Sequence, residues 1–261
     1  MRRTVFAFVV ILLAVLSVAA QQPEPIGYLA EFRVKPGQES KLIELVKKYD
    51  KPLFDRLQAE GAVLAWGLDT RVIHQEGAAT HMLWWATPDY SGMDKVFAGF
   101  AAMNVPDEDE KALQAAVDPD KHHDHITRSI IINLGEEEPS GTVYTSWSFF
   151  KVKPGKSSEW KKLFEKYNKP VYDQLVADGT IFGYGIDVED FHTDDPGWRA
   201  LWVVTTSLGV LDKVDAAFEK AREAMPEEGR QAIGNMFREL TDPSEHRDSL
   251  WRSISLKDGG M

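Results

Sequence analysis

The sequence contains no cysteine. Disulfides, cysteine-ligated zinc and thioether-linked haem are therefore excluded, and burial of apolar side chains must stabilise the fold. We find neither a glycine-rich nucleotide-binding loop nor the nucleophile elbow of serine hydrolases. Positive charge is also scarce, because 30 Lys and Arg face 41 Asp and Glu, which gives a formal net charge of −11. This acidic balance argues against nucleic acid and anionic membrane surfaces as partners.

The first twenty residues have the layout of a secretory signal peptide. A basic start at Arg2 and Arg3 precedes an apolar run over 5–18, and small residues follow at Ala19 and Ala20. We predict a signal peptide over 1–20, an exported protein, periplasmic or secreted, and no membrane contact after cleavage. An uncleaved anchor is the alternative, because the apolar run approaches the roughly 17 to 25 residues that span a bilayer.

An internal repeat dominates the rest of the chain. Residues 28–96 match residues 146–214 at 24 of 69 positions without a gap. A further match has a shift that is six residues longer: "DPDKHHDHITRS" at 118–129 corresponds to "DPSEHRDSLWRS" at 242–253. The chain is therefore a tandem duplication.

Each half contains the same order of predicted elements. In the first half, residue periodicity predicts strands over 26–34, 62–74, 80–87 and 128–134, and helices over 42–60, 93–103 and 108–117. Pro52 and Pro170 predict a kink, or a second helix that begins there, because proline removes a backbone donor. The order β-α-β-β-α-β is the split βαβ unit of ferredoxin-like folds. Large apolar side chains lie on both faces of the strand over 80–87, so both faces of the sheet should be covered.

This element order, the aromatic second and third strands and the duplication resemble the dimeric α+β barrels, in particular their fused members. The resemblance covers nearly all of 26–257. It implies an α+β fold of two tandem ferredoxin-like units, 26–134 and 142–257, joined by a linker at 135–141 and packed sheet to sheet. It also implies a monomer that acts as a pseudo-dimer. The group includes antibiotic-biosynthesis-type monooxygenases and haem-handling enzymes, so the resemblance implies a range of activities.

The repeated motif is predicted to open a short helix. Asp118 and Asp242 each precede a proline, which is the arrangement of an N-cap followed by the first helical turn. Two ion pairs would then form four residues apart on that helix: Asp124 with Arg128, and Asp248 with Arg252. The structural interpretation explains these residues without a ligand.

His122 and His246 are left unexplained by the structural interpretation. A histidine beside the final strand can ligate a metal or haem iron, or act as an acid or base near neutral pH. On the functional interpretation, the candidate catalytic residues are His122, His246, Asp124 and Asp248. Arg128 and Arg252 would then anchor an anionic group of the ligand.

Two further repeated pairs are candidate ligand-binding residues. His74 and His192 end the second strand of each half, and His74 with His122 and Asp124 would form a two-His, one-carboxylate set for a divalent metal. The alternative is a pair of solvated or capping histidines.

Asp69 and Asp187 share a strand face with Gly67 and Gly185, where small residues leave space above the sheet. They are either carboxylates on a pocket floor or exposed strand-end residues in a closely packed sheet.

Two functions therefore remain open. The first is an exported enzyme, monooxygenase-like or haem-handling, that uses haem or a divalent metal on a small hydrophobic or aromatic molecule between sheet and helices. The second is a non-catalytic protein that binds a small ligand or partner, with the repeated His, Asp and Arg only structural. If it is an enzyme, the repeat predicts two equivalent sites or one that has decayed. Because His123 and His125 occur only in the first half, activity is expected there.

Overall fold

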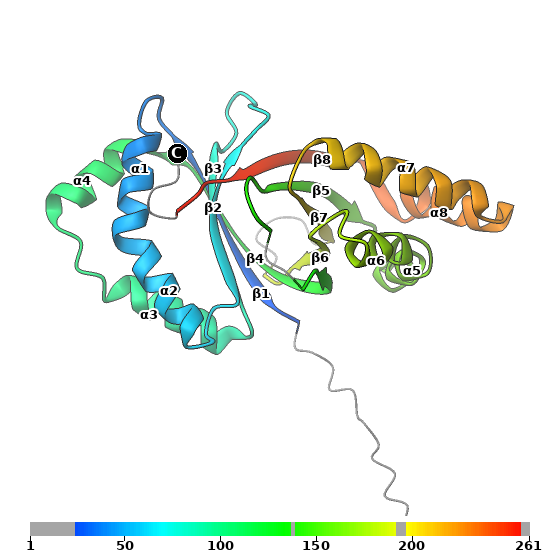
Figure 1. Ribbon diagram of the computed structural model, residues 1–261, viewed down its shortest axis with the longest axis horizontal. Coiled ribbons are helices and arrows are strands. Elements are labelled where there is room, and N and C mark those ends of the chain that lie inside the picture. Colours follow the sequence, from blue (N-terminus) through cyan, green and yellow to red (C-terminus); the bar gives the residue numbers. More distant parts are fainter. Residues whose placement is uncertain (1–23, 137–138, 192–196, 257–261) are drawn as a thin grey trace, which may run out of the picture.

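The strands of the protein form one closed antiparallel barrel. The computed structural model describes residues 24–136, 139–191 and 197–256, and the predicted signal peptide lies outside them. The strand order around the barrel is β1-β3-β2-β8-β5-β7-β6-β4. The helices of the first half flank one side of the barrel and those of the second half flank the other (Figure 1). Within the described ranges, no helix is long and apolar enough to cross a membrane.

The two halves have the same succession of elements. The first half comprises β1 (Ile26–Val34), α1 (Glu39–Leu45), the π-helical turn η1 (Val46–Asp50), α2 (Lys51–Ala59), β2 (Ala65–Arg71), β3 (His81–Thr87), α3 (Tyr90–Ala101), α4 (Asp107–Ala116) and β4 (Val117–Leu134). The second half comprises β5 (Tyr144–Val152), α5 (Ser157–Leu163), η2 (Phe164–Asn168), α6 (Lys169–Ala177), β6 (Gly183–Glu189), β7 (Trp198–Thr205), α7 (Gly209–Ala224), α8 (Glu227–Glu239) and β8 (Thr241–Ser253). A new helix begins beside Pro52 and Pro170, as the sequence predicted.

Strand pairing joins the halves at two seams. Within the first half, β1 pairs with both β3 and β4, and β3 pairs with β2. The second half repeats this order. The seams are β2 against β8 and β4 against β6. The predicted fold class, two ferredoxin-like units closing a barrel within one chain, is therefore confirmed.

Apolar side chains fill both faces of the barrel sheet. Outside the barrel, each half has its own core between helices and sheet, centred on Phe54 and Trp85 in the first and on Trp160 and Tyr184 in the second. Inside the barrel, a shared core combines both halves: Leu29, Met82, Trp147, Ala200 and Trp251, with Trp84 and Trp202 packed against them. This shared core means that neither half is complete without the other.

The repeated motif lies in strands, so the helix predicted for it is wrong. The motif copies belong to β4 and β8, and their ladders with β1 and β5 skip residues 119–121 and 243–246. Each aspartate accepts a hydrogen bond from a backbone N–H two residues later: Asp118 from Asp120 at 3.2 Å, and Asp242 from Ser244 at 3.0 Å. The Asp-Pro sequence therefore forms a side-chain-capped turn in a strand bulge.

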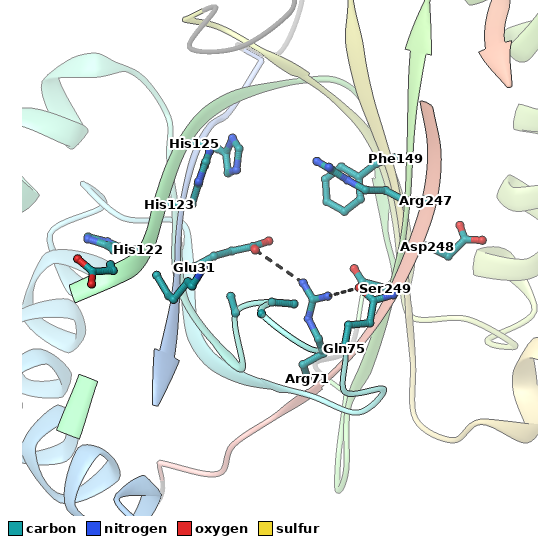
Figure 2. A pocket seen from close by; sticks show the side chains of 15 residues that line it. Glu31, Arg71, Gln75, His122, His123, His125, Phe149, Arg247, Asp248 and Ser249 are labelled. Carbon is teal, nitrogen blue, oxygen red and sulfur yellow. Dashed lines mark hydrogen bonds and ion pairs between the residues drawn. The ribbon is translucent and has the colours of Figure 1, made fainter. Parts of the chain in front are cut away.

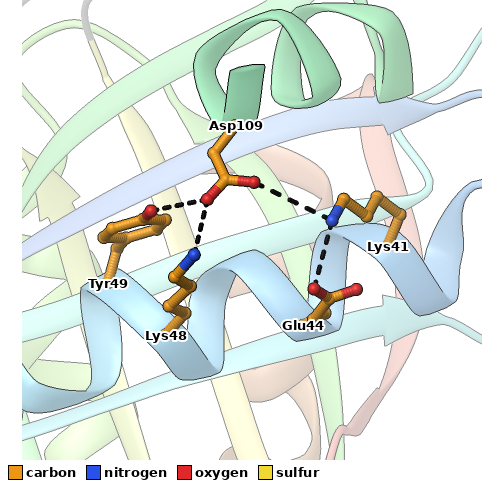
Figure 3. Close-up of polar contacts among 5 residues, drawn as sticks. All are labelled: Lys41, Glu44, Lys48, Tyr49 and Asp109. Atoms are coloured by element: carbon orange, nitrogen blue, oxygen red, sulfur yellow. Dashed lines mark hydrogen bonds and ion pairs between the residues drawn. The ribbon is translucent and has the colours of Figure 1, made fainter. Parts of the chain in front are cut away.

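A buried aspartate fastens α4 to α1 and η1 (Figure 3). Asp109 Oδ2 accepts hydrogen bonds from Lys48 Nζ at 2.7 Å and from Tyr49 Oη at 2.6 Å. Lys41 lies 3.9 Å from the other carboxylate oxygen and 3.1 Å from Glu44. Because α4 leads directly into β4, this cluster fixes where the motif enters the barrel.

Candidate functional site

Strand geometry decides which motif residues share a face. Successive side chains of a strand alternate between its two faces. In β4, Thr127 and Ser129 point into the barrel, where they donate hydrogen bonds to Asp187. His123 and His125 therefore also point inward, and Figure 2 shows both facing a cavity.

His122 and Asp124 lie on the opposite face of β4. Ile126, two residues further along, packs against the helix-side core. His122 Nε2 lies 2.9 Å from the Asp124 carboxylate, and both side chains are about half exposed. His122 is nevertheless one of the residues that line the cavity, whereas its motif counterpart His246 is not. Asp124 lies beside Tyr28, whose pKa is raised to about 12, first by burial and second by this carboxylate.

The cavity toward which His123 and His125 point lies at one end of the barrel and has a volume of about 450 Å³. We call this cavity the barrel mouth. Its lining comes from both halves of the chain. The lining includes the side chains of Glu31, Arg71, His123, His125, Phe149 and Arg247.

Equivalent positions of the two halves differ at the barrel mouth. In the repeat alignment, Glu31 corresponds to Phe149, His123 to Arg247, His125 to Ser249 and Arg71 to Glu189. The duplication therefore built one asymmetric cavity, not two equivalent sites. The expectation of activity confined to the first half does not fit a cavity to which both halves contribute.

Arg71 lies at the inner wall of the barrel mouth with only loose partners. Its side chain is 11% exposed. Its guanidinium lies 3.7 Å from Glu31 and 3.5 Å from Gln75, and its Nε has no hydrogen-bond partner within the described chain. The guanidinium carbon lies 4.7 Å from the ring centroid of Trp251. Burial lowers the pKa of Arg71, Glu31 raises it and the charge of Arg247 lowers it further.

Arg247 enters the barrel mouth from β8. Its guanidinium carbon lies 5.3 Å from the centroid of Phe149 and 4.5 Å from that of Trp198. Such contacts use the flat face of the guanidinium and leave its N–H groups in the plane. The opposite wall carries His123 and His125, whose rings stack at 5.0 Å, and His125 Nδ1 lies 3.8 Å from Glu189.

Two buried aspartates lie on the same inward strand faces, deeper in the barrel. Asp69 and Asp187 are 1% and 6% exposed, so the interpretation of exposed strand-end residues is wrong. Trp84 Nε1 donates to Asp69 at 3.1 Å. This indole lies flat over Gly67, where an added Cβ would meet the ring at 3.0 Å. The small glycine therefore leaves room for the tryptophan that serves the carboxylate.

The two aspartates differ in how well they are satisfied. Asp187 accepts a hydrogen bond at 2.7 Å from Ser129, the last residue of the first motif copy. Asp69 Oδ1 has no hydrogen-bond partner among the described residues. Burial raises the pKa of both carboxyls, and that of Asp69 reaches about 6 despite the hydrogen bonds of Ser253 and Trp84, which oppose the shift.

The other predicted site residues do not converge on one place. His246 lies 3.3 Å from Asp248 and 2.9 Å from Ser148 Oγ, outside the cavity. Arg128 does not pair with Asp124; it donates two hydrogen bonds to Asp190, at 3.1 and 2.8 Å, across the β4–β6 seam. Of the remaining predicted site residues, Arg252 is exposed on β8 and His74 follows β2. His192 lies outside the described residues.

The residues do not fit the predicted metal or haem sites. No three His, Asp or Glu side chains within the described ranges are grouped to hold a metal ion, so His74, His122 and Asp124 do not assemble as a set. A haem iron needs an axial side chain that faces a space for the macrocycle. Aromatic cores occupy the space between helices and sheet in the middle of each half. A cavity of about 650 Å³ beside α6 and the end of β4 has no histidine among its described lining residues. His122 and His246 are half exposed and lie outside the cores and this cavity.

Sequence reasoning missed Arg71 and Arg247 as site residues. The signal was present in the motif, because a period of two places positions 123, 125, 127 and 129 on one face. The helical interpretation concealed it by grouping 124 with 128.

Comparisons with known proteins agree with the fold. Neither family models nor curated proteins give a match to this sequence. A proposed monooxygenase from Lactobacillus acidophilus superposes with a TM-score of 0.60 at 12% identity, over 90% of this chain and 95% of that one. A haem-binding protein from Thermus thermophilus gives 0.52 at 12% identity, over 89% and 92%. Chlorite dismutase from Candidatus Nitrospira defluvii, in complex with imidazole, gives 0.51 at 11% identity, over 89% and 92%. At these identities the likeness shows a shared fold and leaves the activity open.

Proposed function

We propose that this chain is a binding protein that holds one small molecule with a hydrophobic or aromatic part in the barrel mouth. The observation that carries the proposal is a cavity of about 450 Å³ to which both halves contribute non-equivalent side chains. Ligand pockets of proteins typically measure ~300 to 1,000 Å³ and combine apolar walls with a few placed polar groups. The barrel mouth falls within this size range; most of its lining is polar or charged, and Phe149, Ala78 and Ala79 supply its apolar part.

The floor of the barrel mouth supports an aromatic ligand. Phe149 is part of the lining, and the shared core of the barrel interior continues beneath it with Trp147 and Trp251. Aromatic rings pack favourably against such side chains in offset or edge-to-face geometry. The core is filled, so the ligand is expected to stop at the mouth.

The test is isothermal titration calorimetry of the mature chain with 2-naphthoate and its neutral analogue 2-naphthamide. We expect one molecule per chain, and loss of binding in Ala79→Phe, which places a ring in the lining. Ala216→Phe, on the exposed face of α7, is the matched control and should bind normally. Absence of binding by both compounds, or unchanged binding in Ala79→Phe, would refute the proposal.

The enzymatic alternative is that the chain oxidises its ligand. The support for this alternative is the fold that the chain shares with a proposed monooxygenase. Mass spectrometry of the naphthalene compound after aerobic incubation with the protein distinguishes the two functions. Recovery of the unchanged compound supports a binding protein, whereas a gain of one oxygen atom would make the chain an enzyme.

We also propose that the protein is exported. The basic start, the apolar run and the small residues before Gln21 support this. The test is the intact mass of the protein recovered from the extracytoplasmic fraction of its host, which should correspond to a chain that begins at Gln21.

A further inference from the structure

We propose that the ligand is an organic monoanion, whose carboxylate lies between Arg71 and Arg247 while its flat apolar part lies against the aromatic side chains. This inference rests on the proposed function, since it names the class of molecule that the barrel mouth takes. It assigns a role to two arginines that the repeated motif did not single out.

Arg71 lacks a close acceptor. A guanidinium carries five N–H donors in a planar fork. For this nearly buried side chain, the neighbouring oxygens of Glu31 and Gln75 lie at 3.7 and 3.5 Å, which is too far for good hydrogen bonds. Its Nε has no partner in the described chain. Buried donors without an acceptor lower the stability of the fold. An oxygen atom of a molecule bound in the cavity would supply the acceptor that the Arg71 guanidinium lacks.

Arg247 faces Arg71 from the other half of the chain. The two guanidinium groups are close enough for the charge of Arg247 to lower the pKa of Arg71. Phe149 and Trp198 hold the face of Arg247, which leaves its in-plane donors for a ligand. Two like charges that converge on a cavity favour an anion between them. A carboxylate matches the fork geometry of both.

The other charged groups of the barrel mouth limit the ligand to one negative charge. Glu31 already offsets the charge of Arg71 in part. Asp120 and Lys121 lie together at the rim and carry opposite charges. Asp248 also lines the cavity, and its carboxylate lies 3.3 Å from His246. The lining as a whole carries three cationic side chains and three carboxylates, so it has no excess of positive charge and suits a monoanion better than a dianion.

The size of the cavity and the ring of Phe149 favour an organic anion over an inorganic one. A single chloride or phosphate ion would leave most of the 450 Å³ unfilled. A flat aromatic body can occupy the remainder beside the ring of Phe149 and above the shared core. The chemistry that fits is thus an aromatic carboxylate.

The experiment compares 2-naphthoate with 2-naphthamide, which has the same shape and no charge. We expect the carboxylate to bind the wild-type chain at least tenfold more tightly. Arg71→Gln and Arg247→Gln should each reduce that preference to about twofold or less, while binding of the amide persists. Arg247 is exposed, so its substitution should leave the melting temperature unchanged and supplies the test if Arg71→Gln fails to fold.

The control variant is Lys95→Gln, which removes an exposed charge of the same sign on α3, outside the barrel mouth, and should change the preference by less than threefold. Equal binding of the two compounds by the wild-type chain overturns the monoanion and leaves the proposed function standing. A preference that survives loss of Arg247 also overturns it. If neither compound binds, the proposed function fails as well.

Discussion

The buried carboxyl of Asp69 shows how one residue can set the pH dependence of the molecule. Its pKa is raised from 3.8 to about 6, chiefly by burial. The folded protein therefore holds this proton more tightly than the unfolded chain does. The resulting stabilisation is complete below about pH 4 and is lost as the pH rises through about 6. Above that pH, the fold carries a buried carboxylate with one oxygen that lacks a partner among the described residues.

Asp69→Asn should remove this pH dependence. An amide is neutral at every pH and its oxygen can still accept from Trp84. We expect the difference in the free energy of unfolding between variant and wild type to change with pH. Raising the pH from 4 to 8 should shift this difference in favour of the variant by on the order of 1–3 kcal/mol. Urea unfolding at the two pH values measures this, with Asp94→Asn on the exposed face of α3 as the control. A relative stability that is the same at both pH values would contradict the assigned burial effect.

The strand that carries the motif shows why part of the site escaped prediction. An aspartate before a proline is typical of a helix start, and nothing local distinguishes it from a capped turn inside a bulge. The decision is made by pairing with β1, which lies far away in the sequence. The 3.6-residue period of a helix would place Asp124 and Arg128 on one face. The two-residue period of the actual strand places His123 and His125 on one face instead. The repeat itself, the element order and the barrel followed from the sequence, because they depend on patterns that both halves carry.

The cluster around Asp109 is expected to hold α4 in place. Asp109→Asn keeps an acceptor for Tyr49 and removes the charge that attracts Lys48 and Lys41. We expect the melting temperature to fall by a few degrees and hydrogen exchange to accelerate in α4 first. Glu110→Gln, next to it on the exposed side of α4, is the control. Equal effects of the two variants would show that the cluster contributes nothing specific.

The β4–β6 seam offers an internal comparison between the halves. Arg128 makes a two-pronged contact with Asp190, whereas its equivalent Arg252 is exposed on β8. Arg128→Gln should lower the free energy of unfolding by about 1 kcal/mol, and Arg252→Gln by clearly less. Denaturant unfolding of both variants tests this. A larger loss in the Arg252 variant would reverse the assignment of the stabilising seam contact.

The closure of the barrel has consequences for the whole molecule. Both outer strands of each half are paired with the other half, so the described chain offers no open sheet edge at the seams. Open edges are the usual route by which sheets associate. We therefore expect a monomer that acts as a pseudo-dimer, and light scattering across a concentration series should give the mass of one chain. A mass of two chains at the lowest concentration would contradict this.

The proposed site belongs to the whole molecule, because it exists only where the two halves meet. A crystal structure of the chain with bound 2-naphthoate tests this. We expect one naphthoate in the barrel mouth, with its carboxylate in contact with Arg71 of the first half and Arg247 of the second. A naphthoate between the helices and sheet of one half, or two molecules at equivalent places in both halves, would contradict it.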